Sequence, residues 1–391
     1  MQKIAKMDYP MCYLSRGLGH WLLICLIGLG WACENRYLKG EQLPPLPQAD
    51  ANSLAKRLDF MNQIIQQNSG EADYFYRRAL IYLQIGKQNL ALADIGSALK
   101  LDSGKYEYFY TQAKLLDLAK NHLGAFQAAK RAEQMGYSTP EFTWLLGKLS
   151  FLNQSDEQAE QYFLASRTLL GERAETFYYL GMIKKQANDT LNSASFLNRA
   201  IELQPAYPEA FKALVGIYEQ SGEPKKAVRY AYRAVTNCPN NAQLYELYGK
   251  CLENIDETAE AIPWYEKAAR LDPGLWLANH QLAMYHLRKE HYVTAATYLR
   301  SALVVKPTWD YGHAVLGWIY FEHLDNYPKA LRHYEMAAKI KPGDPDLAAR
   351  VARVQKRIAY EEYKKTPEGQ AHIARKRREE AHRAADSLAQ E

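Results

Sequence analysis

The chain has 391 residues, which is enough for two or three ordinary domains or for one long array of repeats. Apolar residues make up 48% and charged residues 24%, so the composition is that of a folded protein and excludes a largely disordered chain. The formal net charge of +5 is small, and basic and acidic residues are interspersed, which argues against the strong positive field of a nucleic-acid-binding protein.

Residues 1–32 have the features of a secretory signal peptide. Lys3, Lys6 and Arg16 precede a run without charged residues that extends over residues 17–33. The strongly apolar part of this run, residues 21–32, is shorter than the roughly 20 residues that a membrane-spanning helix needs. A basic start, a short apolar run and a small residue before the cut predict a cleaved signal.

The end of this segment, LGWAC at residues 29–33, resembles the lipobox of bacterial lipoproteins. In that family the cysteine becomes the lipid-bearing first residue after cleavage, and Ala32 fits the small position before the cut. Gly30 and Trp31 depart from the family's usual residues. The resemblance implies acyl chains such as palmitate on Cys33, and the alternatives are an uncleaved signal anchor or a cleaved soluble form.

Residues 33–52 read as a proline-rich tether. Pro44, Pro45 and Pro47 favour an extended polyproline geometry, which would hold a folded body away from the lipid anchor. A ligand for a proline-reading domain is the alternative role of this stretch.

The body of the chain, residues 72–344, consists of a 34-residue repeat. The register starts at Ala72 and recurs in eight copies, the last with one inserted residue. Position 8 is Gly or Ala in seven copies, and position 32 is Pro in the last five. Small residues let helices approach closely, and a proline ends the second helix of a pair, so the pattern predicts stacked helix pairs.

This pattern resembles the tetratricopeptide repeat. The sixth copy shows the family's residues at positions 4, 7, 8, 11, 20, 24, 27 and 32: Tyr245, Tyr248, Gly249, Leu252, Ala261, Tyr265, Ala268 and Pro273. The resemblance implies an all-α, right-handed superhelical solenoid of about eight helix-turn-helix repeats with capping helices.

Three flanking segments are expected around the array. Residues 53–71 predict an N-terminal capping helix or partial repeat, because apolar residues recur there at helical spacing. Residues 345–365 predict a C-terminal capping helix with one apolar stripe. Residues 366–391 predict a charged, solvated and partly helical tail, with a patch for nucleic acid or anionic lipid as the alternative.

The resemblance also implies a partner-binding groove, because in such arrays positions 2, 5, 9 and 12 of each first helix line the concave face. Two sets of residues at these positions are candidates. Position 5 of the first four copies is aromatic, at Tyr76, Tyr110, Trp144 and Tyr178. Copies seven and eight are largely apolar, at Leu277, Met284, Leu287, Tyr311, Trp318 and Phe321. The aromatic row suits a scaffold as well as a ligand platform, and the apolar run indicates a buried partner segment or the chain's own tail.

Chemistry-bearing motifs are missing from the sequence. We find no dinucleotide or phosphate loop and no zinc-protease motif, and we expect no enzyme activity, catalytic residue, cofactor or metal. Six of the ten histidines fall in copies seven and eight, but none lies four residues from another, so packing and surface roles are favoured over a metal site. Cys238 and Cys251 suit helix packing, with a disulfide between them as the alternative.

The sequence thus predicts a membrane-tethered scaffold that binds a protein or peptide in its groove and does not bind nucleic acid. It resembles the lipid-anchored repeat proteins that help assemble envelope or secretion machinery. That resemblance implies the bacterial cell envelope, at the outer membrane facing the periplasm, with the inner membrane as the alternative. The competing interpretations are a signal-anchored adaptor that faces the cytoplasm and an envelope enzyme with an unrecognised site.

Overall fold

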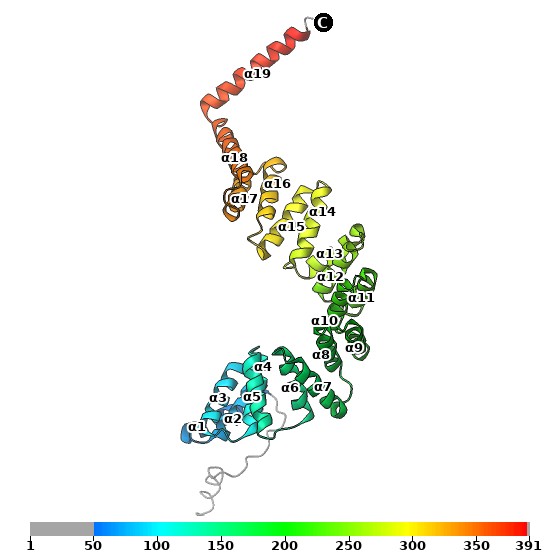
Figure 1. The fold of residues 1–391 in the computed structure, drawn as a ribbon. Helices are drawn as coiled ribbons and strands as arrows, with labels where there is room; N and C mark the ends of the chain where they lie inside the picture. The colour runs from blue at the N-terminus through cyan, green and yellow to red at the C-terminus, as the bar shows by residue number, and fades with distance from the viewer. Residues whose placement is uncertain (1–50, 389–391) are drawn as a thin grey trace, which may run out of the picture. The chain divides into compact units, whose positions relative to one another are not determined.

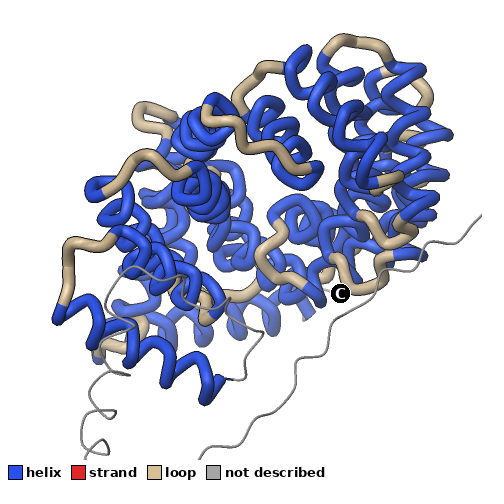
Figure 2. Tube along the Cα trace, turned by 90° about the horizontal axis from the view of Figure 1, so that it is seen from below, coloured by secondary structure: helices blue, strands red, loops and turns tan. Residues whose placement is uncertain are grey.

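The computed structural model describes residues 51–388, and in this range it contains 19 α-helices and no strand (Figures 1 and 2). The predicted all-α repeat architecture is therefore confirmed. The predicted signal peptide, Cys33 and most of the predicted tether lie outside the described residues. The described residues form two compact units, which divide between residues 101 and 102. Between residues 51 and 388, no helix combines the length and apolarity that crossing a bilayer requires.

In the first unit, α1 (Ala51–Gln67) packs on the pair α2 (Ala72–Gln84) and α3 (Gln88–Leu101). Met61 and Ile64 of α1 are buried against Tyr74 and Ile81 of α2. One side chain ties the three helices together: Arg78 donates to both carboxylate oxygens of Asp94 at 2.7 Å and to Asn62 Oδ1 at 3.0 Å. Asp94 is only 5% exposed, so this bidentate ion pair compensates a buried charge.

The second unit holds seven helix pairs followed by two single helices. The pairs are α4 (Tyr106–Leu118) with α5 (His122–Gln134), α6 (Pro140–Leu152) with α7 (Asp156–Leu170), α8 (Ala174–Gln186) with α9 (Thr190–Leu203), α10 (Pro208–Gln220) with α11 (Pro224–Asn237), α12 (Ala242–Glu253) with α13 (Thr258–Leu271), α14 (Trp276–Arg288) with α15 (Tyr292–Val305), and α16 (Asp310–Glu322) with α17 (Tyr327–Ile340). The single helices are α18 (Pro345–Tyr363) and α19 (Pro367–Leu388). Within this unit the second helix of every pair also contacts the helix that follows it, so each pair covers the apolar side of the next.

Where position 8 is glycine, the contact inside the pair requires a small residue, whereas the fifth copy has Val215 at position 8 and Ala231 at position 24. A Cβ atom added at Gly181 would lie 2.7 Å from Leu197 Cγ, and one at Gly249 would lie 2.9 Å from the Tyr265 ring. These distances are shorter than van der Waals contact, so a larger side chain would push the two helices apart.

The turn between the helices of a pair contains a residue with positive φ at the same place in every copy. Only two of the eight are glycine, Gly86 and Gly222. The others are Lys120, Gln154, Asn188, Asp256, Glu290 and, after the inserted residue, Asp325. A left-handed residue ends the first helix and lets the backbone reverse, and most copies tolerate its steric cost without glycine.

Helix α18 closes the array. Leu347, Val351, Val354 and Ile358 lie on one side and pack on the apolar cluster of the last two repeats. The other side, with residues such as Ala352, is exposed. Such a helix seals the final pair and leaves a surface that water can solvate.

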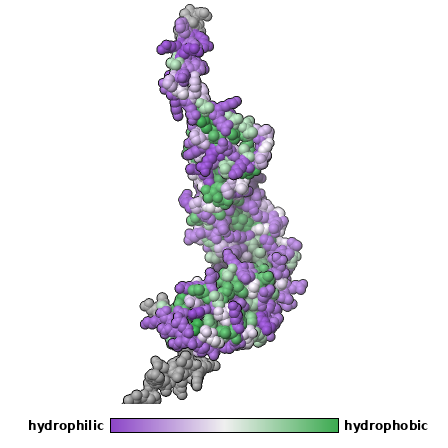
Figure 3. All heavy atoms as spheres, turned by 90° about the vertical axis from the view of Figure 1, so that its left-hand side faces the viewer, coloured by the Kyte–Doolittle hydropathy of each residue, from purple (hydrophilic) through white to green (hydrophobic). Residues whose placement is uncertain are grey.

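A tight corner separates α18 from α19. The Thr366 hydroxyl accepts a hydrogen bond from the Gly369 amide at 3.1 Å, and a Cβ atom at Gly369 would lie 2.0 Å from the Tyr363 carbonyl oxygen. Helix α19 is largely exposed, and its end of the molecule is hydrophilic, whereas apolar residues gather in patches over the repeats (Figure 3).

The tail is helical throughout its described part, more than the partly helical segment that the sequence led us to expect. Arg375 lies 3.5 Å from Glu379, and Lys376 lies 4.0 Å from Glu380. Ion pairs at this i, i+4 spacing support an exposed helix, which explains the additional helicity.

Candidate protein-binding groove

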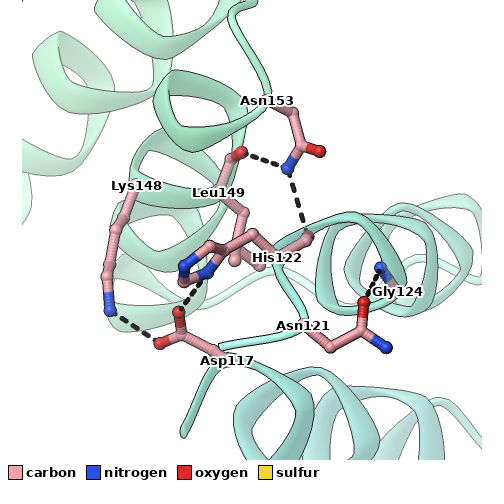
Figure 4. Close-up of polar contacts among 7 residues, drawn as sticks. All are labelled: Asp117, Asn121, His122, Gly124, Lys148, Leu149 and Asn153. Atoms are coloured by element: carbon pink, nitrogen blue, oxygen red, sulfur yellow. Dashed lines mark hydrogen bonds and ion pairs between the residues drawn. The ribbon is translucent and has the colours of Figure 1, made fainter. Parts of the chain in front are cut away.

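We define the groove side by positions 2, 5, 9 and 12 of the first helices. Polar residues on this side of α4 and α6 contact one another (Figure 4). Lys148 Nζ of α6 lies 2.7 Å from Asp117 Oδ2 of α4, and His122 Nδ1 lies 3.5 Å from the other carboxylate oxygen. Asn153 Nδ2 donates to the backbone oxygens of His122, at 3.1 Å, and of Leu149, at 2.8 Å. These contacts fix two repeats relative to each other.

The same connection between positions 12 and 9 recurs further along the array. Glu219 of α10 accepts from Lys250 at 3.2 Å and from Asn254 at 2.9 Å. A similar ion pair starts one position later, where Glu322, at position 13 of the eighth copy on α16, pairs with Arg353 of α18 at 3.1 Å. The charged part of the groove side therefore forms ion pairs within the chain, which leaves fewer free charges for a partner.

Two residues of the predicted aromatic row pack firmly against their neighbours. The ring of Tyr110 lies 4.9 Å from that of Tyr137 and 5.6 Å from that of Phe142. Trp144 Nε1 donates to Thr176 Oγ1 at 3.1 Å, and the Arg173 guanidinium lies 5.2 Å from the Trp144 ring. These contacts give both residues a scaffold role.

The other two residues of the row are also half-buried. Tyr178 packs against Tyr207 with ring centroids 5.3 Å apart, and burial, together with the charge of Glu209, raises the pKa of Tyr178. Tyr76 lies on α2 of the first unit. A contact between the aromatic row and a partner protein stays a prediction.

The predicted apolar run lies on α14 and α16, and much of it packs within the fold. Leu277 packs in the same apolar cluster as Leu282, and Met284 and Leu287 pack on the apolar cluster of the last two repeats. Tyr311 differs, because 55% of its surface is exposed.

Trp318 and Phe321 are half-buried beside the chain's own helix α18. The Phe321 ring lies 5.0 Å from the guanidinium of Arg353, and Trp318 packs edge-on against His323 at 4.5 Å. The capping helix therefore covers part of the apolar run, and substitution of these two residues would also disturb the cap.

A cavity of about 430 Å³ opens between α16 and α18. Its apolar lining consists of Leu287, Ala314, Val315, Trp318 and Leu347. Its polar lining consists of Asp310, Tyr311, Lys341, Asp344, Asp346 and Arg350. We call this cavity the C-terminal pocket. A second hollow of about 370 Å³ shares Trp318, Asp346 and Arg350 with it.

The sequence prediction missed the residues that α18 contributes to the C-terminal pocket. A signal was present: when the register is continued past the inserted residue, Asp346 falls at position 2 and Arg353 at position 9. Helix α18 is thus placed like the first helix of a ninth repeat, and it extends the groove side.

The histidines of the last repeats pack against rings of neighbouring residues. Among the described residues, no group of three or more metal-ligating side chains comes together. His313 is 7% exposed and its Nδ1 lies 3.0 Å from that of His333, while His313 Nε2 lies 3.1 Å from the Pro307 carbonyl oxygen. The carbonyl accepts from Nε2, so His313 receives its second hydrogen bond from His333 at Nδ1.

This histidine pair should make the array acid-sensitive. Burial lowers the pKa of His313, and burial with nearby positive charges lowers the pKa of His333 from its ordinary 6.5 to about 4. The charges beside His333 are His313, Arg332, Arg300 and Lys329, and Tyr320 stacks on its ring. As the pH falls from 6.5 to about 4, the unfolded chain binds protons at these histidines before the folded chain does, so the folded state loses stability in that range.

In the His333→Gln variant we expect the urea midpoint to decrease less between about pH 7 and about pH 5 than it does in the wild type. An unchanged fall would contradict this assignment.

Cys238 and Cys251 are buried free thiols and form no disulfide. Burial, with a contribution from Glu219, raises the pKa of Cys251 to about 12, so this thiol is protonated and unreactive at neutral pH.

Family models described as the tetratricopeptide repeat match residues 72–105, 208–251 and 242–275. The three matched segments are tetratricopeptide repeats. The chain is 24% identical over 237 residues to anaphase-promoting complex subunit 3 of Schizosaccharomyces pombe, a match that covers 61% of this chain and 34% of that protein. It is 22% identical over 317 residues to BBSome complex member BBS4 of Bos taurus, covering 72% of this chain and 60% of that protein. These matches span less than two thirds of the length of either relative.

Solved tetratricopeptide repeat structures are also similar to this chain. A protein from Parabacteroides merdae matches with a TM-score of 0.46 and 17% identity, covering 59% of this chain and 91% of that one. The C-terminal part of a repeat protein from Cytophaga hutchinsonii matches with a TM-score of 0.46 and 16% identity, covering 61% and 97%.

Proposed function

We propose that the chain is a protein-interaction scaffold that holds a segment of a partner protein on the groove side of α14, α16 and α18. The observation that carries the proposal is the C-terminal pocket, where the exposed Tyr311 stands beside an apolar lining. Exposed aromatic residues at the edge of a pocket are frequent anchors of protein interfaces. Both curated relatives are named as members of multiprotein complexes, which supports a role in assembly.

Photo-crosslinking in cells tests this proposal. A photoreactive amino acid placed at Tyr311 should trap a defined partner protein. The matched control carries the same group at Val304 of α15, which is 82% exposed and lies outside the groove positions. Equal trapping at both positions, or trapping at neither, would contradict binding on the groove side.

We propose further that the scaffold is tethered to a bacterial envelope membrane through lipid on Cys33, at the outer membrane facing the periplasm. The proposal is supported by the lipobox-like LGWAC and the proline-rich stretch that follows it. Three acyl chains would hold the protein firmly on a membrane, because each buried methylene contributes about 0.8 kcal/mol.

Metabolic labelling with palmitate tests the tether. We expect label on the wild-type chain and none on the Cys33→Ala variant, with Cys25→Ala as a control that keeps the label. A wild-type chain without label would remove the lipid anchor and favour the signal-anchored adaptor.

A further inference from the structure

The C-terminal pocket combines an apolar lining with an excess of negative charge. Three carboxylates, Asp310, Asp344 and Asp346, and two cations, Lys341 and Arg350, line it together with the apolar residues. The net charge of this lining would attract a cation only weakly. The attraction depends on which of the five charged side chains already form ion pairs within the chain.

Both cations are held by carboxylates of the chain itself. Lys341 Nζ lies 2.9 Å from Asp344, and Arg350 Nε lies 2.7 Å from Asp346. Asp344 is used a second time, because its Oδ1 accepts from the backbone amides of Asp346 and Leu347 at the start of α18. These ion pairs weaken the attraction that either cation exerts on a partner carboxylate.

Asp310 remains as the available charge. Within the described part of the chain its carboxylate makes no hydrogen bond or ion pair, although Lys341 senses its charge at longer range. It stands in the first turn of α16, where the helix dipole favours a negative charge, and it is followed directly by Tyr311. A cation that approaches the exposed Tyr311 ring therefore meets an ionised carboxylate beside an aromatic face.

We propose that the C-terminal pocket recognises a partner segment with a large apolar side chain and a neighbouring Lys or Arg. The apolar side chain enters between Leu287, Val315 and Leu347, and the basic side chain pairs with Asp310 beside Tyr311. This inference rests on the proposed function and names the chemistry of the partner that the groove holds. Charge complementarity selects the basic neighbour, and the apolar lining selects the anchor.

Peptide selection on the full chain tests the proposal. The probe is a display library of random peptides, selected in parallel on the wild type and on Tyr311→Ala, Asp310→Lys and Glu335→Gln. Glu335 is an exposed acid of α17 outside the pocket lining, and its variant is the matched control. On the wild type and on Glu335→Gln we expect enrichment of peptides that place an apolar residue next to Lys or Arg. On Asp310→Lys we expect that basic preference to disappear.

The affinity of the most enriched peptide, measured by fluorescence polarisation, should fall at least about tenfold on Asp310→Lys, which corresponds to about 1.4 kcal/mol. Enriched peptides that need Tyr311 but are acidic, or carry no charge preference, would overturn this inference and leave the proposed function standing. Failure of the wild type to enrich any peptide above Tyr311→Ala would overturn both. Circular dichroism of each variant checks that the helices are retained.

Discussion

Replacing Phe211 by alanine is expected to lower the free energy of unfolding by about 3–5 kcal/mol. Phe211 stands at position 4 of the fifth repeat, is fully buried and belongs to the largest apolar cluster, which joins α8 through α12. Its loss leaves a cavity between pairs that stabilise each other, and in a repeat array each contact supports only the neighbouring units. Urea unfolding followed by circular dichroism measures the change.

Leu191→Ala provides the matched control for this experiment. Leu191 is 82% exposed on α9, so its truncation should change the free energy of unfolding by less than about 0.5 kcal/mol. If Phe211→Ala unfolded at the wild-type urea midpoint, the apolar cluster around Phe211 would not contribute the expected free energy of unfolding.

Ending the chain after Gly343 is expected to unfold the last repeat and to cause self-association. The truncation removes α18, whose Leu347 and Val354 are buried against the last two repeats, and it uncovers Trp318 and Phe321. Each large aliphatic side chain that leaves the core forfeits about 1.5–3 kcal/mol of apolar burial. Light scattering after size-exclusion chromatography reports the association, and binding of a hydrophobic dye reports the exposed surface.

A second truncation, after Thr366, separates the effect of the cap from that of chain length. It removes only α19, which is largely exposed, so the protein should remain monodisperse with a urea midpoint close to that of the full chain. If the two truncations behaved alike, α18 would not be the element that seals the array.

The repeat register was predictable because it follows from packing between neighbouring elements. A small residue at position 8, as at Gly181, faces a larger one at position 24, as at Leu197, inside most pairs, and this pattern recurs along the chain. The first helices of the second unit accordingly begin at the residues that start each repeat, Tyr106 to Asp310. Local chemistry repeated many times leaves a readable signal even without an alignment.

The turns were not predictable in the same way. Glycine, asparagine or aspartate, which favour positive φ, occupies this position in five of the eight copies, but residues such as Lys120 and Glu290 also adopt it, so composition gives only a partial turn signal. The geometry is imposed by the two helices that the turn joins. Where the residue is Lys, Gln or Glu, tertiary packing decides the backbone against propensity.

The groove was only partly predictable. The sequence assigned Tyr311 and Trp318 to one side of the expected helix, and both line the C-terminal pocket. It did not show that α18 covers Phe321 and supplies Asp346 and Arg350 to that pocket. Those contacts join the capping helix, which follows the eighth copy, to residues of the last repeats. Which charges are paired, and hence that Asp310 is available, depends on side-chain positions that no spacing rule specifies.

Hydrogen–deuterium exchange of the full chain tests the central claim most directly, namely that a partner occupies the groove side at the C-terminal end of the array. Exchange is measured with and without the protein that is trapped from Tyr311. When the partner is present, we expect slower exchange in α14, α16 and α18 and unchanged exchange in α15. Protection confined to α15 and α17, or none in α16 and α18, would contradict it.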